Sequence, residues 1–149
     1  MKSAKDKAWD EMSRYVRIRD AVNGYCSCVT CGRAYPAGGQ GCIQVGHYIN
    51  RGYTALMFHP HNVHPQCYVC NCRRSGEPQL YRQWMIDRYG LEHVEYLESH
   101  MRIKTRSTTA TWAEWKRRIM QAKEIAANGG DGDALLLEWW AEWLDGAKL

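Results

Sequence analysis

Two pairs of cysteines, Cys28 with Cys31 and Cys67 with Cys70, have the C-x2-C spacing that lets both thiolates of a pair reach one metal ion. Two such pairs complete the tetrahedral four-thiolate shell of a structural Zn2+ site. Seven cysteines is an odd number, and such a density favours metal binding over a disulfide framework. We therefore predict structural zinc. Incidental buried thiols and a redox pair are the alternatives, and Cys26 competes with Cys28 as a ligand.

Histidines and asparagines lie between and directly after these pairs, in the order His47, Asn62, His64 and Asn71. A zinc-clasped two-stranded hairpin followed by a helix, with His on the first strand, Asn in the connection and His or Asn after the last zinc ligand, is the layout of HNH nucleases. Cys67 and Asn71 are four residues apart, so they share a face if they open a helix. The zinc would then position Asn71 opposite the hairpin that carries His47.

Further motifs surround these residues over positions 9–125. They are Tyr15-Val16-Arg17-Ile18-Arg19-Asp20, Cys28-x2-Cys31-Gly32, Val45-Gly46-His47-Tyr48, Asn62-Val63-His64-x-Gln66-Cys67-x2-Cys70-Asn71, Ser75-Gly76 and Tyr81-Arg82. Taken together and in this order, the motifs resemble those of the phage NinG, or Rap, recombination endonucleases, which act on branched DNA such as Holliday junctions. The Trp-rich tail from Asp133 lies outside the resemblance.

The resemblance implies a role for each residue. Phosphodiester hydrolysis needs a general base that takes a proton from water and a divalent cation that neutralises charge on the phosphate and the departing oxygen. His47 would be the general base and Asn71 a ligand of catalytic Mg2+ or Mn2+. Asn62 would orient the hairpin or His47. His64 and Gln44, or water molecules, would complete the shell of the catalytic metal.

Basic side chains form two clusters that are expected to contact DNA. The first lies around the site, where guanidinium and backbone N–H groups would hold the phosphate next to the cut. The second would hold another arm of a branched substrate, with a solvated helix face as the alternative. No base-reading motif is present, so we expect recognition of DNA shape and backbone. The first cluster comprises Arg51, Arg73, Arg74 and Ser75, and the second Arg102, Lys104, Arg106, Lys116, Arg117 and Arg118.

The elements that must position these residues are marked by caps and by apolar residues three and four positions apart. Helical periodicity is absent from Tyr25 to about Cys72. There, Val45, His47 and Ile49 share one face of a predicted strand, with Thr54–Phe58 as its partner. Five helices are predicted. The first runs from Ser3 to Asn23-Gly24, the second from Pro78 to Gly90, and a short third covers 91–97. The fourth begins at a Thr111–Glu114 capping box and ends at Asn128-Gly129-Gly130, and the fifth begins at an Asp133 cap.

The predicted fold class is α+β, with a zinc-clasped ββα core of the HNH, or His-Me finger, type and flanking α-helices. The chain would comprise an N-terminal helix (1–24), the zinc-bound HNH-like core (25–76), a helical DNA-binding extension (77–127), and a hinge with an apolar C-terminal helix (128–149).

Size and composition exclude several classes of protein. A chain of 149 residues is too short for a large multidomain enzyme. No run approaches the roughly 20 apolar residues that span a bilayer, and the N-terminus is charged where a signal peptide needs apolar residues. We therefore expect a soluble cytoplasmic protein, located in the host bacterial cytoplasm if it is phage-encoded. The net charge of +4 arises in the first 120 residues, because residues 121–149 are net acidic.

The helix after Asp133 is too apolar to stand alone in water, and a four-way junction calls for two symmetric cuts. Both observations predict a homodimer with the segment 134–145 in its interface. In the alternative, this helix folds back over the chain's own Trp112–Ile119 stripe.

The leading function is a Mg2+-dependent, structure-selective endonuclease of branched DNA. Many HNH enzymes carry a metal-binding Asp or His immediately before the base, whereas this chain has Gly46. That departure keeps open a zinc-stabilised DNA-binding module without catalysis. A third reading is an HNH nuclease that acts on linear duplex. All three share one fold, so fold alone does not decide between them.

Overall fold

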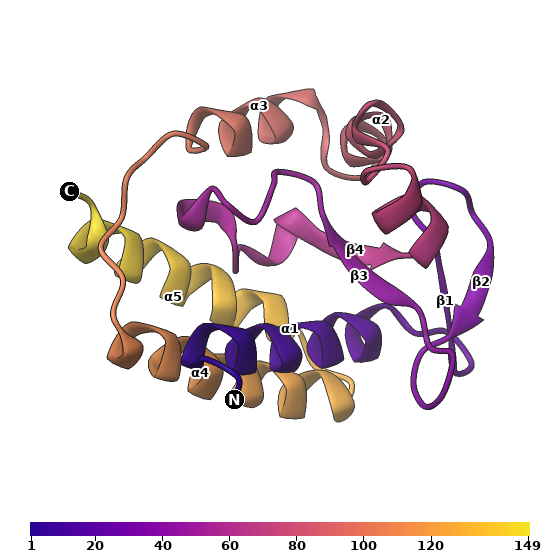
Figure 1. Ribbon diagram of the computed structural model, residues 1–149, viewed down its shortest axis with the longest axis horizontal. Helices are drawn as coiled ribbons and strands as arrows, with labels where there is room; N and C mark the ends of the chain where they lie inside the picture. The colour runs from indigo at the N-terminus through magenta and orange to yellow at the C-terminus, as the bar shows by residue number, and fades with distance from the viewer.

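The computed structural model describes residues 1–149 and arranges two layers of helices around a small hairpin (Figure 1). Helices α1 (Ala4–Asp20), α4 (Thr109–Ala127) and α5 (Gly132–Ala147) form one layer, and α2 (Pro78–Tyr89) and α3 (Leu91–Ser99) form the other. The hairpin of β3 (Gln44–His47) and β4 (Val63–Gln66) lies between them. The α+β fold class is therefore confirmed. None of the helices is long and apolar enough to cross a membrane.

Helix α1 begins as the sequence predicts and supplies one wall of the core. The Ser3 hydroxyl accepts a hydrogen bond from the backbone N–H of Asp6 at 3.1 Å, which satisfies one free donor of the first turn. Its buried face, which includes Met12, Tyr15 and Val16, packs along α4. This face also contacts β3 and β4, so α1 covers one side of the hairpin.

Two antiparallel hairpins carry the cysteines and the candidate site. Strand β1 (Tyr25–Ser27) pairs with β2 (Ala34–Pro36), and β3 pairs with β4 in a register that places Gly46 opposite His64. The prediction that Thr54–Phe58 is the partner strand is wrong. This segment begins with a 3-10 turn, η1 (Thr54–Leu56), and its apolar residues are buried in the core instead of joining the sheet.

The last element of the predicted ββα core differs from a regular helix. A π-helical turn, η3 (Val69–Arg73), follows β4 after Cys67 and Tyr68, and α2 begins only at Pro78. Single π turns of this kind occur frequently at functional sites. The predicted HNH-type ββα core is thus not confirmed, because the strand pair is followed by a π turn and not by a regular helix.

Two predicted helix caps are wrong by a few residues. Helix α4 is capped by Thr108, whose side chain and backbone exchange hydrogen bonds with Thr111, and not by a Thr111–Glu114 box. Helix α5 is capped by Asp131, which accepts from the backbone N–H of Ala134 at 3.3 Å. Asp133 cannot serve as the cap because its carboxylate accepts hydrogen bonds from the Tyr15 hydroxyl and from Arg19 of α1.

Helix α5 is covered by its own chain. Leu136, Trp140 and Trp143 are buried in the main core, and the ring centroids of Trp115 and Trp143 lie 5.4 Å apart. The indole N–H of Trp140 donates to the backbone oxygen of Ala55 at 2.7 Å. The helix therefore folds back on the α4 stripe, and the exposed apolar patch from which we predicted a dimer interface over 134–145 is not present.

Candidate functional site

The four predicted zinc ligands come together at one end of the molecule. The sulfur atoms of Cys28, Cys31, Cys67 and Cys70 all lie within 4.8 Å of one another. Four thiolates at this spacing can hold a zinc ion in tetrahedral geometry. Cys26 is not part of the cluster, because its thiol donates to the backbone oxygen of Arg17 at 3.4 Å.

Local backbone geometry explains how the first pair forms. The N–H of Gly32 donates to the oxygen of Cys28 at 2.8 Å, which closes a tight turn between β1 and β2. Gly32 has φ of +79°, a conformation that side chains other than glycine rarely adopt. The second pair follows β4 directly, so the cluster links the β1–β2 turn to the end of the β3–β4 hairpin.

The two faces of the β3–β4 hairpin have different neighbours. Because side chains alternate along a strand, Val45 and His47 point to one face, and Gln44 and Gly46 to the other. The ring of His47 stacks on Trp9 of α1 at 4.5 Å, whereas Gln44 accepts a hydrogen bond from η3. The predicted base and the predicted metal ligand Asn71 are thus assigned to opposite faces, and Gly46, directly before His47, lies on the face of Asn71.

His47 is held in the protonation state that a general base requires. Its Nε2 lies 2.9 Å from the backbone oxygen of Met57, an atom that only accepts, so Nε2 carries the proton and Nδ1 has a free lone pair. Burial lowers the pKa of His47 to about 4, opposed by the Met57 hydrogen bond and assisted by the nearby Arg51 guanidinium. His47 is therefore neutral at pH 7 and able to accept a proton.

Trp9 is a site residue that the sequence did not reveal. Its ring lies nearly parallel to that of His47, with 25° between the planes, and Arg51 lies over it at 5.7 Å from the ring centroid. Helical periodicity identified Trp9 only as part of the apolar face of α1. Its pairing with a strand residue 38 positions later has no local signal.

Asn62 and His64 occupy buried structural positions. The Asn62 side chain bonds to both the N–H and the oxygen of Ile49, at 2.7 and 3.0 Å, and so closes the loop between β3 and β4, as expected for a residue that orients the hairpin. His64 does not fit its predicted metal role. It is only 2 % exposed, and its two ring nitrogens are hydrogen-bonded to the hydroxyls of Tyr81 and Tyr89, at 3.0 and 2.7 Å.

Asn71 lies in η3, four residues after Cys67, as predicted. Its backbone N–H donates to the oxygen of Cys67 at 2.8 Å, so the cysteine cluster and Asn71 belong to one turn. Its side-chain Nδ2 donates to Oε1 of Gln44 at 3.0 Å. The same Gln44 oxygen also accepts from the Cys72 thiol, which makes Gln44 a support for η3 and leaves it poorly placed as a metal ligand.

Gln66 is the second residue that sequence reasoning missed. It is completely buried on β4, and its Oε1 has no hydrogen-bond partner. A Cβ atom placed on Gly46 would overlap this oxygen and would lie 3.0 Å from Oδ1 of Asn71. Two amide oxygens therefore converge on the one position of β3 that has no side chain.

The side chains of the first predicted DNA-contact cluster remain exposed, but backbone N–H groups beside them, including those of Arg74 and Gly76, are engaged within the chain. Arg51, Arg73, Arg74 and Ser75 are all exposed. The backbone N–H of Arg74 donates to the oxygen of Val69, so it is occupied by the end of η3 and not free for a phosphate. Arg74 also lies 3.8 Å from Glu77.

The second basic cluster is partly neutralised within the chain. Arg117 and Arg118 both pair with Glu114, at 2.6 and 2.9 Å, and hold the pKa of Glu114 at about 2. Arg118 also lies over the ring of Trp139. These two arginines fit the alternative of a solvated helix face. The exposed cations of this cluster lie mainly in the segment before α4, at Arg102, Lys104 and Arg106.

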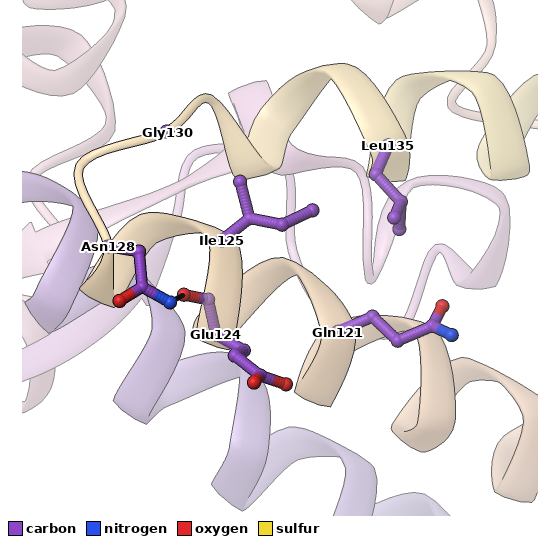
Figure 2. Close-up of a pocket in the computed structure, with 6 residues that line it drawn as sticks. All are labelled: Gln121, Glu124, Ile125, Asn128, Gly130 and Leu135. Atoms are coloured by element: carbon purple, nitrogen blue, oxygen red, sulfur yellow. Dashed lines mark hydrogen bonds between the residues drawn. The ribbon is translucent and has the colours of Figure 1, made fainter.

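Two cavities lie apart from these catalytic candidates. The first, of about 600 Å³, lies between α4 and α5, where Ile125 and Leu135 face each other (Figure 2). The second, of about 1060 Å³, is lined by the β1–β2 region, α2 and the turn between α4 and α5. Neither contains His47 or Asn71.

Comparisons with known proteins place these motifs in context. A family model described as Bacteriophage Lambda NinG protein matches residues 2–127. Protein ninG of Salmonella phage P22 is 30% identical over 122 residues, which cover 79% of this chain and 57% of that protein. Protein ninG of Escherichia phage lambda is 33% identical over 95 residues, covering 63% of this chain and 43% of that protein. The chain thus spans about half the length of these relatives. No solved structure matches.

Proposed function

Because this chain belongs to the NinG family of phage proteins, we propose that it is a metal-dependent endonuclease that hydrolyses phosphodiester bonds in branched DNA such as Holliday junctions. Its place of action would then be the cytoplasm of the bacterial host. The observation that carries the proposal is His47, which has a free Nδ1 and a lowered pKa on a hairpin anchored by four cysteines.

In the proposed reaction, His47 accepts a proton at Nδ1 from the attacking water. Met57 holds the opposite ring nitrogen through its backbone oxygen, and Trp9 fixes the plane of the ring. A pKa of about 4 makes His47 a weak base. It also keeps the imidazole neutral at pH 7, so His47 does not have to lose a proton before it can accept one from water. Exposed Arg51, next to Trp9, would contact the phosphate backbone beside the base.

The catalytic divalent cation implied by this function fits the other face of the hairpin. The orphaned oxygen of Gln66 and the oxygen of Asn71 are neutral hard donors, which suit Mg2+ or Mn2+ better than softer metals. Asn71 would hold the cation, which when bound would neutralise charge on the phosphate and the departing oxygen. His64 would take no part, since both of its ring nitrogens are engaged.

The experiment is cleavage of a labelled four-way junction by the zinc-loaded protein with Mg2+ or Mn2+, with linear duplex of the same sequence as the comparison. His47→Ala should abolish cleavage and leave junction binding nearly intact, because the base contributes to proton transfer and little to backbone affinity. His100→Ala, which changes a histidine directly after α3 and outside the hairpin, is the matched control. Parental cleavage by His47→Ala would refute the assignment of the base.

A second candidate function is a zinc-stabilised DNA-binding module without catalysis. The observation that favours it is Gly46, which cannot supply the metal ligand that HNH nucleases carry at this position. A parent protein that binds junctions but cuts neither branched nor linear DNA with either metal would establish this alternative. Equal cutting of junction and duplex would instead support an HNH nuclease of linear DNA.

The proposed homodimer now rests only on the symmetry of the substrate. Two symmetric cuts in a four-way junction are delivered most simply by a two-fold pair of subunits. Light scattering on the free protein and on its junction complex tests this, and a single subunit in the complex would exclude it.

A further inference from the structure

The amide of Gln66 has one fixed orientation. Its Nε2 donates to the backbone oxygen of Gly76 at 2.8 Å and to the Thr30 hydroxyl at 3.2 Å. A backbone oxygen accepts only, so a flipped amide would place two acceptors against each other. Oε1 of Gln66 therefore points toward Gly46, where no donor meets it. A completely buried oxygen without a partner is rare in folded proteins and indicates that a bound partner satisfies it.

The amide of Asn71 has a matching orientation in the structure. Its Nδ2 donates to Oε1 of Gln44, an oxygen that also accepts the Cys72 thiol, so Oδ1 of Asn71 is the atom that faces Gly46. Two carbonyl dipoles then point their negative ends at one region. Such an arrangement is unfavourable on its own and becomes favourable when a cation or a hydrogen-bond donor lies between the oxygens.

We propose that Oε1 of Gln66 and Oδ1 of Asn71 together bind a divalent metal ion, with Gln66 supplying from β4 the ligand that Gly46 cannot supply from β3. The inference rests on the proposed function in one respect, namely that the ion at this site serves cleavage. The absence of a side chain at position 46 is then part of the site, since any Cβ there would overlap the Gln66 oxygen.

The chemistry of the donors selects the ion. Mg2+ and Mn2+ prefer oxygen ligands and retain several waters, so two amide oxygens from the protein are sufficient. The four thiolates of the neighbouring cysteine cluster prefer zinc. The two sites are thus chemically distinct although Asn71 follows Cys70 directly in the chain.

The test measures binding of Mn2+ to the zinc-loaded full-length protein without DNA, from the loss of the free Mn2+ signal in electron paramagnetic resonance, with Mg2+ as competitor. Asn71→Asp adds a charged ligand, and the Gln44 amide can turn to donate to its second oxygen, so binding should tighten about tenfold relative to the parent. Gln121→Glu adds the same charge on an exposed position of α4 and should leave the affinity unchanged. Gln66→Ala should weaken binding about tenfold or more.

A rescue variant separates a metal ligand from a structural residue, because Gln66→Ala also removes the hydrogen bonds to Gly76 and Thr30. Combined with Gln66→Ala, Gly46→Asp has room for its side chain and moves the ligand to β3. It should restore Mn2+ affinity to at least the parental value, which a purely structural role of Gln66 does not predict. Zinc content confirms that each variant is folded around its cysteines.

Parental Mn2+ affinity in Gln66→Ala, or no rescue by the double variant, would overturn the inference. Its failure is distinguishable from that of the proposed function. If Mn2+ binding depends on Gln66 but the protein cuts no DNA, the metal site is supported and the proposed nuclease activity is refuted. If cleavage does not depend on Gln66, the proposed nuclease activity is supported and the assignment of Gln66 as a metal ligand is refuted.

Discussion

Replacement of Trp9 by alanine should raise the pKa of His47. Burial is the main cause of the low pKa of about 4, and Trp9 covers one face of the imidazole at 4.5 Å. Removal of the indole admits water to that face, which stabilises the charged imidazolium. The pKa should therefore move toward the ordinary value of 6.5. Each unit of this change corresponds to about 1.4 kcal/mol of difference between the two protonation states.

The shift predicts a specific change in the pH profile of cleavage. With a pKa of about 4, His47 is almost completely neutral at pH 5.5, so the parental rate should be insensitive to its titration above that pH. If the pKa rises fully to 6.5, only about a tenth of His47 is neutral at pH 5.5. The Trp9→Ala rate should then fall by up to about tenfold between pH 7.5 and 5.5.

The pKa itself can be measured without any activity, from the pH dependence of the His47 ring signals in NMR spectra, assigned with His47→Gln. Trp9→Phe keeps an aromatic ring over the imidazole and should keep the pKa near the parental value.

The low pKa of His47 in the parent protein also makes stability depend on pH. Between pH 6.5 and about 4 the unfolded chain binds a proton at His47 that the folded protein does not, so stability falls with decreasing pH in this window. A parental pKa near 6.5, or an unchanged pKa in Trp9→Ala, would refute the reasoning.

Three further outcomes are expected. Cys67→Ser should lose the bound zinc and lower the melting temperature, whereas Cys26→Ser should retain zinc, as measured by elemental analysis and thermal denaturation. Gly46→Ala should displace the Gln66 amide and lower the free energy of unfolding by about 1–3 kcal/mol, as measured by urea denaturation. A chain that ends at Gly130 should unfold at a markedly lower temperature, because α5 belongs to the core; a truncated protein as stable as the parent would contradict the packing of this helix.

Much of the helical framework could be predicted from local signals. Ser3 and Pro78 begin helices at the predicted positions, and the stop at Gly90 is observed. Each of these signals acts within a few residues, through a capping hydrogen bond or a restricted backbone angle. The cluster of four cysteines could also be predicted, because C-x2-C spacing directly constrains where two thiolates can meet.

The second strand could not be predicted because β4 carries no alternating pattern. All four of its residues are buried, and one of them is Pro65, which is unusual within a strand. The strand is fixed by what lies at its two ends: the Asn62 side chain bonds the backbone of Ile49 before it, and Cys67 joins the zinc cluster after it. The composition of Thr54–Phe58 is more typical of a strand than that of β4, but its apolar side chains are buried in the core.

The division of the candidate site between two faces follows from the register of this strand pair. Side chains alternate along β3, so His47 faces α1 and the position before it faces η3, and the pairing of Gly46 with His64 places Gln66 on the η3 face. Shifting the pairing by one residue would exchange the faces of every side chain on β4, and would move Gln66 away from Gly46. Because Cys67 follows Gln66 directly, a zinc ion held by the cysteine cluster would fix the register at that end of the hairpin. Structural zinc would therefore position both proposed ligands of the catalytic cation, since it anchors η3 with Asn71 and also keeps the Gln66 oxygen over the position where β3 has no side chain.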